Sequence, residues 1–413
     1  MAILGQVVKA TIEKPAKASS SLSHRLVLLM SVCTGMSAAS LYYAQPLLDS
    51  IRQALHIGTG TAGFIVSMTQ IGYISGLVLL VPLGDMFVRR VLLPVMIVGL
   101  ALFLAIVSAA PSAGFLLAGS LIVGALSVTA QITVAFSASL ASDEQRGRIV
   151  GTVMSGLLLG ILLARTASGY LAQLGGWRTP FRVAAVVMAV LAVVLWRTLP
   201  REAERAPVRY TRVLASVPVL LKDEPVILLR SVYGAAAFGA FNALWTPLAF
   251  LLSSSPYRYS TSTIGLFGLL GVAGALAASF AGRFADRGHA AAMTAVTAGL
   301  MLVAWLPVAI GRHSLGALIA GIVVLDFAVQ GLHITNQSII YRLRPEARSR
   351  ITSAYMSLYF VGGVIGSVSA STAYAAAGWA ASAAVGAAFG LVAVVLWAGV
   401  TVRHRVLAGS LTA

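Results

Sequence analysis

Residues 175–178 read Gly-Gly-Trp-Arg and residues 377–380 read Ala-Gly-Trp-Ala, so a Gly-Trp pair recurs after 202 residues. The same interval, or one residue less, separates further pairs: Arg146 from Arg348, Arg148 from Arg350, and Asp85 from Asp286. Long apolar runs fill the sequence between these residues. Self-similarity at a fixed interval is typical of repeated architectures, so the chain is expected to fold as two homologous halves.

The amino-acid composition excludes an ordinary water-soluble protein. Of the 413 residues, 59% are hydrophobic and 10% are charged, whereas about a quarter of a soluble domain is charged. Most of the molecular surface must therefore be apolar and face lipid. The single cysteine, Cys33, can form neither an intrachain disulfide nor a metal cluster and is expected to pack in the core. No cofactor and no metal site are expected.

Twelve apolar runs are long enough to cross a membrane, which takes about 20 helical residues. The expected spans are 26–48, 61–83, 91–110, 115–140, 149–171, 179–199, 226–252, 263–281, 291–310, 315–338, 351–374 and 381–402. We predict an all-α membrane protein whose twelve transmembrane helices form two pseudo-symmetric six-helix bundles. The expected organisation is an N-terminal tail (1–24), a first bundle (25–199), a central loop (200–225), a second bundle (226–402) and a C-terminal tail (403–413).

The distribution of positive charge predicts the orientation in the membrane. The tails and the loops after even-numbered spans hold 23 of the 29 lysine and arginine residues, counting those at span edges. The opposite side holds five, and Arg165 lies within a span. Because cytoplasmic loops carry the excess of these residues, both tails are expected to be cytoplasmic. The cations form no basic face with interleaved aromatic residues, so the net charge of +17 does not indicate nucleic-acid binding.

Two polar loops occupy equivalent places in the two halves. Residues 85–90 read Asp-Met-Phe-Val-Arg-Arg, and residues 282–288 read Gly-Arg-Phe-Ala-Asp-Arg-Gly. With its twelve spans and six-plus-six repeat, the chain resembles the major facilitator superfamily, whose loop signature is Gly-x-x-x-Asp-Arg-x-Gly-Arg-Arg. Both copies depart from this signature; Val81, Met86 and Val88 replace Gly, Arg and Gly in the first. The resemblance implies a gating latch between helix ends, with ordinary loop charge as the alternative. Its candidate residues are Asp85, Arg89, Arg90, Asp286 and Arg287.

The fifth span partly matches the antiporter signature Gly-x-x-x-Gly-Pro-x-x-Gly-Gly of the same family. Gly156 and Gly160 agree with it, whereas Ile161 replaces the proline and Ala164-Arg165 replaces the glycine pair. This span and the sequence Tyr-Tyr-Ala-Gln-Pro at residues 42–46 resemble bacterial efflux permeases of the drug and sugar exporter branches. The resemblance implies a multi-pass protein of the bacterial inner membrane.

One acidic residue lies deep in the bilayer. Ten of the twelve acidic residues fall in cytoplasmic segments, Asp49 ends the first span, and Asp326 lies about 16 Å along the tenth at 1.5 Å per residue. Asp49 is expected to be a solvated helix end. Ionisable groups in the membrane cost several kcal/mol unless they are paired or hydrated, so Asp326 is a functional candidate. We predict that Asp326 couples transport to protons, with a structural ion pair as the alternative. Residues on or beside its helix face follow at i+4, i+7, i+10 and i+11: Gln330, His333, Asn336 and Gln337.

His333 is the candidate proton relay on this face, because an imidazole changes charge near neutral pH. Arg165 is the other charged group within a span, and it needs an anion, a carbonyl group or water as a partner. It is expected to bind an anionic substrate group, to pair with an acidic residue, or to reach toward the membrane surface. Further polar and aromatic side chains are expected to line a substrate cavity, although helix packing explains each of them alone. The whole cavity set is Arg165, Gln330, Gln337, Asn336, Tyr42, Gln45, Gln70, Gln131, Asn242 and Trp245.

Glycines spaced three or four residues apart are expected at helix interfaces, where helix backbones approach closely. They lie on spans 2, 5, 8 and 11, which pair across the two halves in the family that the chain resembles. The candidate residues are Gly72, Gly76, Gly156, Gly160, Gly268, Gly271, Gly362 and Gly366. Static packing is the alternative to a moving interface.

These features favour a secondary active transporter that exports a small amphiphilic molecule (a drug, sugar or metabolite) by proton antiport and alternating access. Its expected partners are the substrate, protons and the lipid bilayer, and a monomer is expected to suffice. Proton-coupled uptake by symport, or a non-transporting membrane sensor on the same fold, are the alternatives. An enzyme is not expected, because one deep Asp and one deep His are too few for a catalytic cluster.

Overall fold

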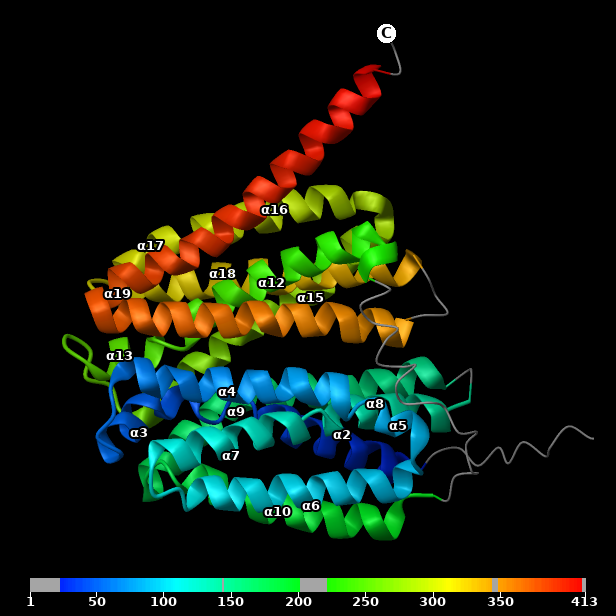
Figure 1. The fold of residues 1–413 in the computed structure, drawn as a ribbon, viewed down its shortest axis with the longest axis vertical. Coiled ribbons are helices and arrows are strands. Elements are labelled where there is room, and N and C mark those ends of the chain that lie inside the picture. The colour runs from blue at the N-terminus through cyan, green and yellow to red at the C-terminus, as the bar shows by residue number, and fades with distance from the viewer. Residues whose placement is uncertain (1–22, 143–144, 201–220, 344–347, 411–413) are drawn as a thin grey trace, which may run out of the picture.

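The structure, a computed structural model, describes residues 23–142, 145–200, 221–343 and 348–410, and these ranges form helices and no strand. Figure 1 shows the helices of the first half and those of the second half as two groups lying side by side. The first half contains α2 (His24–Ala39), η1 (Gln45–Leu47), α3 (Leu48–Ala54), α4 (Thr59–Leu79), α5 (Leu83–Met86), α6 (Arg89–Ser108), α7 (Ala113–Leu126), α8 (Thr129–Leu140), α9 (Arg146–Gly175) and α10 (Thr179–Thr198). The second half contains α12 (Pro225–Trp245), α13 (Leu248–Ser253), α14 (Thr261–Leu266), η2 (Phe267–Gly271), α15 (Val272–Phe284), η3 (Ala285–His289), α16 (Ala290–Val303), α17 (Trp305–Ile310), α18 (Leu315–Leu343) and α19 (Arg348–Ser410).

The described helices provide twelve membrane crossings. Nine helical segments of the described ranges are long and apolar enough to span a bilayer. One of them, Ile351–Val402 within α19, bends at Ala377 and Gly378 and therefore crosses twice. Two shorter apolar helices, His24–Ala39 and Thr261–Gly274, supply the remaining crossings. The predicted twelve-helix, two-bundle fold is confirmed, while most of the predicted tail 1–24 and central loop 200–225 fall outside the described residues.

Several crossings that the sequence predicts as continuous helices are interrupted. The first crossing is divided into α2, η1 and α3, and Pro46 lies in the break. The seventh crossing is divided into α12 and α13, with Pro247 between them. Because proline lacks an amide N–H and clashes with the preceding turn, it ends or bends a helix. These breaks matter because they adjoin the residues that form the polar cluster described below.

The repeat in the sequence is also a repeat in the structure. Gly176 ends α9 with φ of 80°, and Gly378 bends α19 with φ of 76°, a backbone conformation that glycine adopts without penalty. Each glycine is followed by a buried indole, Trp177 or Trp379. The N–H of Trp379 donates a hydrogen bond of 2.8 Å to the carbonyl of Val308. The same turn therefore joins the last two crossings of each half.

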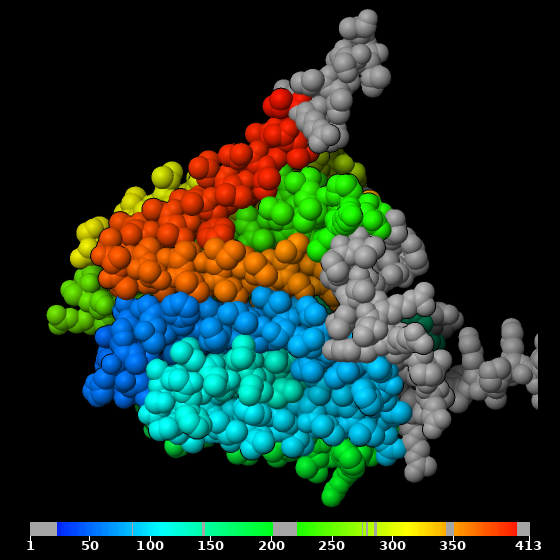
Figure 2. All heavy atoms as spheres, in the orientation of Figure 1, coloured from blue at the N-terminus to red at the C-terminus, as the bar shows by residue number. Residues whose placement is uncertain are grey.

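The two halves meet along two pairs of helices, and these are the pairs that the family resemblance implies. Helix α4 packs against α19, and α9 packs against α14 and η2. The space-filling view shows α4 and the first part of α19 in contact along one face of the molecule (Figure 2). At one end, which we call the α3 end, α3 also contacts α13. The buried apolar side chains of these two helices include Leu48, Ile51, Phe250 and Leu251.

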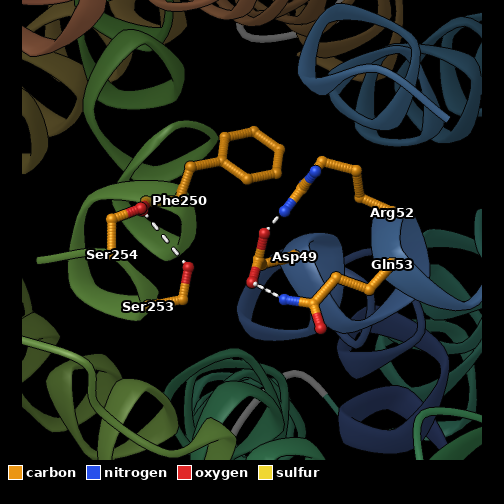
Figure 3. A network of polar contacts seen from close by, with 6 residues as sticks. All are labelled: Asp49, Arg52, Gln53, Phe250, Ser253 and Ser254. Atoms are coloured by element: carbon orange, nitrogen blue, oxygen red, sulfur yellow. Dashed lines mark hydrogen bonds and ion pairs between the residues drawn. The ribbon is translucent and has the colours of Figure 1, made fainter. Parts of the chain in front are cut away.

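Asp49 lies in a small polar network at the α3 end. Its two carboxylate oxygens accept hydrogen bonds from Arg52 Nε at 2.8 Å and from Gln53 Nε2 at 2.7 Å. Figure 3 shows this network on α3 facing the end of α13, where Ser253 and Ser254 bond to the carbonyl of Phe250. Asp49 lies in the first turn of α3, and both of its partners, Arg52 and Gln53, lie on the same helix, so its charge is balanced locally.

Most of the predicted interface glycines pack within one half rather than between halves. A Cβ at Gly72 or Gly76 would overlap the backbone of α7, and one at Gly156 or Gly160 would overlap α2. The contacts of Gly362 and Gly366 are with α12 in the same half. These six glycines do lie at close helix contacts, but the contacts are inside one half and not at the boundary between the halves, which is the static packing given as the alternative. Gly268 does lie on that boundary, because a Cβ there would come 2.8 Å from Cβ of Arg165, and Gly271 lies 3.5 Å from Leu162 by the same measure.

Candidate substrate and proton site

The centre of the candidate site is Arg165, which α9 carries to the boundary between the halves. The residue is 4% exposed, and its Nε donates a hydrogen bond of 2.7 Å to Oε1 of Gln45. Its guanidinium carbon lies 4.8 Å from the ring centre of Tyr42, 5.4 Å from Phe241 and 4.2 Å from Trp245. Tyr42 and Gln45 belong to the first half, whereas Phe241 and Trp245 belong to α12 of the second. The cation is thus held by aromatic and amide groups from both halves.

Asp326 approaches the same cluster from α18. It is 3% exposed, and its Oδ1 accepts a hydrogen bond of 3.1 Å from the indole N–H of Trp245. Asp326 and Arg165 lie within electrostatic range of each other without a direct ion pair among the described residues. Trp245 therefore contacts both charges, the anion through its N–H and the cation through its ring. The sequence identified the two charged residues as functional candidates, but nothing in it indicated that one indole would contact both.

A second polar contact crosses the boundary beside this cluster. Gln70 Nε2 on α4 donates a hydrogen bond of 2.6 Å to Oδ1 of Asn242 on α12. The Nδ2 of Asn242 in turn donates to the carbonyl of Phe238 at 3.0 Å. Gln70 is 4% exposed and Asn242 is fully buried, so this hydrogen bond is shielded from water and lipid. It ties the two halves together near the middle of the molecule.

A double-mutant cycle tests this contact. Gln70→Leu is expected to destabilise the protein by about 1–3 kcal/mol, because it leaves the buried Oδ1 of Asn242 without its donor. Adding Asn242→Leu is expected to recover part of the loss, since the second change removes the unpaired oxygen. Thermal unfolding of the purified variants measures both effects. Strictly additive losses would show that the two side chains do not interact.

The remaining cavity candidates occupy separate places. Gln131 is half-buried and donates to the hydroxyl of Tyr73 at 3.1 Å, and the ring of Tyr73 lies 4.4 Å from Phe360 of the other half. Gln330 packs against α15, where a Cβ at Gly274 would lie 2.8 Å from its Cγ. Gln337 is half-buried on α18, farther from Asp326 along the helix. Gln131 thus lies beside the boundary, whereas Gln330 contacts a neighbour within its own half.

His333 lies among the aromatic residues of α19. Its Nδ1 is 3.0 Å from the hydroxyl of Tyr355, and its ring centre is 4.6 Å from that of Tyr359. Tyr359 is also within electrostatic range of Asp326. Tyr359 is therefore a neighbour of His333 that also carries a hydroxyl group. The sequence offered no signal for these tyrosines, which look like ordinary packing residues of a span.

Arg230 is a half-buried cation whose partners the sequence did not indicate. It lies one turn into α12 and was counted among the arginines at span edges. Its Nη1 donates to Oγ1 of Thr294 at 2.9 Å and to Oδ1 of Asn336 at 3.4 Å, and its guanidinium lies 5.4 Å from the ring of Tyr233. Asn336 therefore belongs to this second cluster inside the second half, apart from Arg165. The depth of Arg230 within its span, and not its residue type, was the signal in the sequence that could have identified it.

The predicted latch residues differ in how they are held. Arg89 is buried, donates to the carbonyl of Gly84 at 2.8 Å and to Ser139 Oγ at 3.0 Å, and so joins the end of α5 to α8. Arg90 is half-buried and Arg287 is exposed. The side chains of Asp85 and Asp286 lie outside what the structure describes. Within the described residues, Arg89 thus connects helix ends of one half.

Twelve crossings in two bundles, with buried charges at their boundary, define a polytopic membrane transporter. The model of the Major Facilitator Superfamily matches residues 28–311, and the chain belongs to this family. Membership places the protein among transporters rather than enzymes.

Known relatives and structures agree with the family. The "Uncharacterized transporter YgaY" of Escherichia coli O157:H7 is 47% identical over 351 residues, covering 85% of this chain and 89% of that protein. A "Probable sugar efflux transporter" of Helicobacter pylori is 23% identical over 274 residues, covering 66% of this chain and 68% of that protein. A crystal structure of a bacterial homologue of the human lysosomal transporter Spinster, inward-facing and occupied, superimposes with a TM-score of 0.73 at 12% identity, covering 90% and 95% of the two chains. The last comparison shows the fold alone.

Proposed function

We propose that the protein is a secondary active transporter that exports a small amphiphilic molecule in exchange for protons. The observation that carries the proposal is the pair of buried charges on one indole: Asp326 accepts from the N–H of Trp245, and Arg165 lies 4.2 Å from the ring centre of Trp245. Asp326 belongs to the second half and Arg165 to the first. A change of charge on Asp326 therefore acts on the boundary that alternating access must open and close.

Asp326 is the group proposed to carry the proton. Its charged form is attracted to Arg165 and accepts the indole hydrogen bond, which favours the approach of the two halves at this point. Its protonated form loses that attraction, so the halves separate more easily. Arg165 and Tyr359 are the ionisable groups described around it, and of these Arg165 remains charged. His333 is the proposed relay, reached through Tyr359.

The same proposal includes the orientation of the protein in the membrane and the roles of its two ends. With both tails in the cytoplasm of a bacterial cell, the α3 end would face outward, and the contact between α3 and α13 would close it. The loops around Asp85 and Asp286 would then latch the opposite end, with Arg89 holding α5 to α8. A monomer contains every residue of this scheme. The efflux name of the Helicobacter pylori relative and the partial antiporter signature support export.

Transport by purified protein in proteoliposomes tests the proposal. The vesicles carry an internal pH dye and a pH gradient, and they are screened with dyes, sugars, nucleosides and organic acids. Substrate-evoked proton movement opposite to the substrate is the expected result. Movement of both in the same direction would replace antiport by symport. A substrate that binds without any flux would instead indicate a sensor on the same fold.

A further inference from the structure

Two neighbouring hydrogen-bond donors in the cluster have no acceptor among the described residues. They are Nη2 of Arg165 and Nε2 of Gln45, and both atoms are buried. The two side chains are joined, because the Nε of Arg165 donates to the Oε1 of the same Gln45 amide. Arg165 is 4% exposed and Gln45 is 2% exposed, so neither donor is left to water or lipid at the surface. A buried donor without a partner is costly, and more so when it is charged. The pair is therefore suited to an incoming acceptor, preferably a negative one.

The neighbouring side chains do not supply that acceptor. Asp326 directs its described hydrogen bond to Trp245, and the ion pair found among the described residues is the one between Asp49 and Arg52. Tyr42 contacts the guanidinium of Arg165 through the face of its ring. An oxygen with a negative charge, from a molecule other than the protein, would satisfy both donors at once.

The surroundings of the two donors indicate what the rest of that molecule is like. The rings of Tyr42, Phe241 and Trp245 lie around Arg165, and the rings of Phe241 and Trp245 are 5.9 Å apart. Ligand sites commonly combine an apolar, aromatic surface with a few placed polar groups that fix orientation. Here the aromatic surface and the unpaired donors adjoin each other. A molecule with an acidic head and an apolar or aromatic body matches both.

We propose that the substrate is an organic anion, whose carboxylate or similar acidic group binds Arg165 Nη2 and Gln45 Nε2 while its apolar body lies against the three rings. This inference rests on the proposed function, because it names the substrate class of the same site.

Binding of matched pairs of molecules tests the substrate class. Purified full-length protein in lipid nanodiscs is titrated calorimetrically, at one pH, with 1-naphthoate, its neutral amide 1-naphthamide and the cation 1-naphthylmethylammonium. A second pair, 4-tert-butylbenzoate and its amide, varies the apolar body. Each carboxylate is expected to bind roughly tenfold or more tightly than its amide, because a hydrogen bond to a charged group is lost in the amide. The cation is expected to bind more weakly than the amide.

Three variants assign the preference to the site. Arg165→Gln is expected to reduce the preference for carboxylate to about twofold or less, while binding of the amide persists through the rings. Gln45→Leu keeps the charge and is expected to reduce the preference only partly, and it carries the test if Arg165→Gln does not fold. The matched control is Arg178→Gln. Arg178 also lies against a tryptophan ring, 4.3 Å from the centre of Trp177, but it donates to the carbonyl of Ala110 outside the site, so the preference should remain unchanged.

Several results would overturn the inference. Equal affinity for acid and amide in both pairs would do so, as would the absence of binding by every acid, or an unchanged preference in Arg165→Gln. The assay uses no proton gradient, so its outcome is separate from that of the transport assay. A preserved carboxylate preference without proton antiport would reject the coupling proposal alone. Proton antiport of an uncharged substrate would reject the organic-anion inference alone.

Discussion

Asp326→Asn is expected to abolish proton-coupled transport. Asparagine keeps a carbonyl oxygen that can accept the hydrogen bond from Trp245, so the local packing is retained. It cannot bind or release a proton, so the variant loses the exchange of charge beside Arg165. In proteoliposomes, substrate-evoked proton movement should fall to the level of empty vesicles. Exchange of labelled for unlabelled substrate at equal pH on both sides should persist, because it requires no net proton movement.

The matched control is Asp49→Asn. Asp49 is the other acidic residue that the sequence places outside the cytoplasmic segments, and the structure shows it bonded to its own helix through Arg52 and Gln53. Proton coupling should survive this change. Wild-type coupling in Asp326→Asn, or loss of coupling in both variants alike, would contradict the assignment of Asp326.

Gly72→Ala is expected to destabilise the protein by about 1–3 kcal/mol, the usual range for overpacking a close helix contact. A Cβ at this position would overlap the carbonyl of Leu121 and lie 3.0 Å from the amide nitrogen of Ala125 on α7. Backbone atoms cannot rotate away as a side chain does, so α4 and α7 must separate. A marked fall in the midpoint of thermal unfolding, measured in one detergent for all variants, is the expected observation.

Gly60→Ala provides the control on the same helix. No atom lies within 4 Å of a Cβ at Gly60, and alanine favours helix more than glycine does. Its unfolding midpoint should equal or slightly exceed that of the wild type. If Gly72→Ala melted together with Gly60→Ala, the close packing of α4 on α7 would be wrong.

The fold was largely predictable because membrane crossing is a local property of the sequence. Each span must satisfy its own backbone hydrogen bonds in lipid, so about 20 apolar residues are enough to indicate a helix. The recurring Gly-Trp pair predicted the two halves, and the structure places Gly176 and Gly378 in equivalent turns. Breaks such as the one at Pro46 were harder to predict, because a proline can end a crossing or only bend it.

The candidate site was predictable only in part. Asp326 and Arg165 could be identified because charges are rare and costly inside a membrane. Their partners could not, since Gln45 and Arg165 are 120 residues apart and Trp245 and Asp326 are 81 apart. The sequence left three alternatives for Arg165: an anionic substrate group, an acidic residue, or the membrane surface. None of them included the three aromatic rings that contact it. Arg230 was missed because charge near a span end usually lies at the membrane surface.

The sequence by itself determined a membrane protein, its twelve crossings, its internal repeat and its two deepest charges, because composition and periodicity within one segment report burial in lipid. Only the tertiary structure decided which segments meet. It showed that Gly72, Gly156 and Gly362 pack inside the bundles and not at the boundary between the halves. A glycine in a sequence indicates a close helix contact but does not indicate which helix is the neighbour. It also placed Asp326 and Arg165 on the two sides of one indole, a contact that arises only when the two halves pack together.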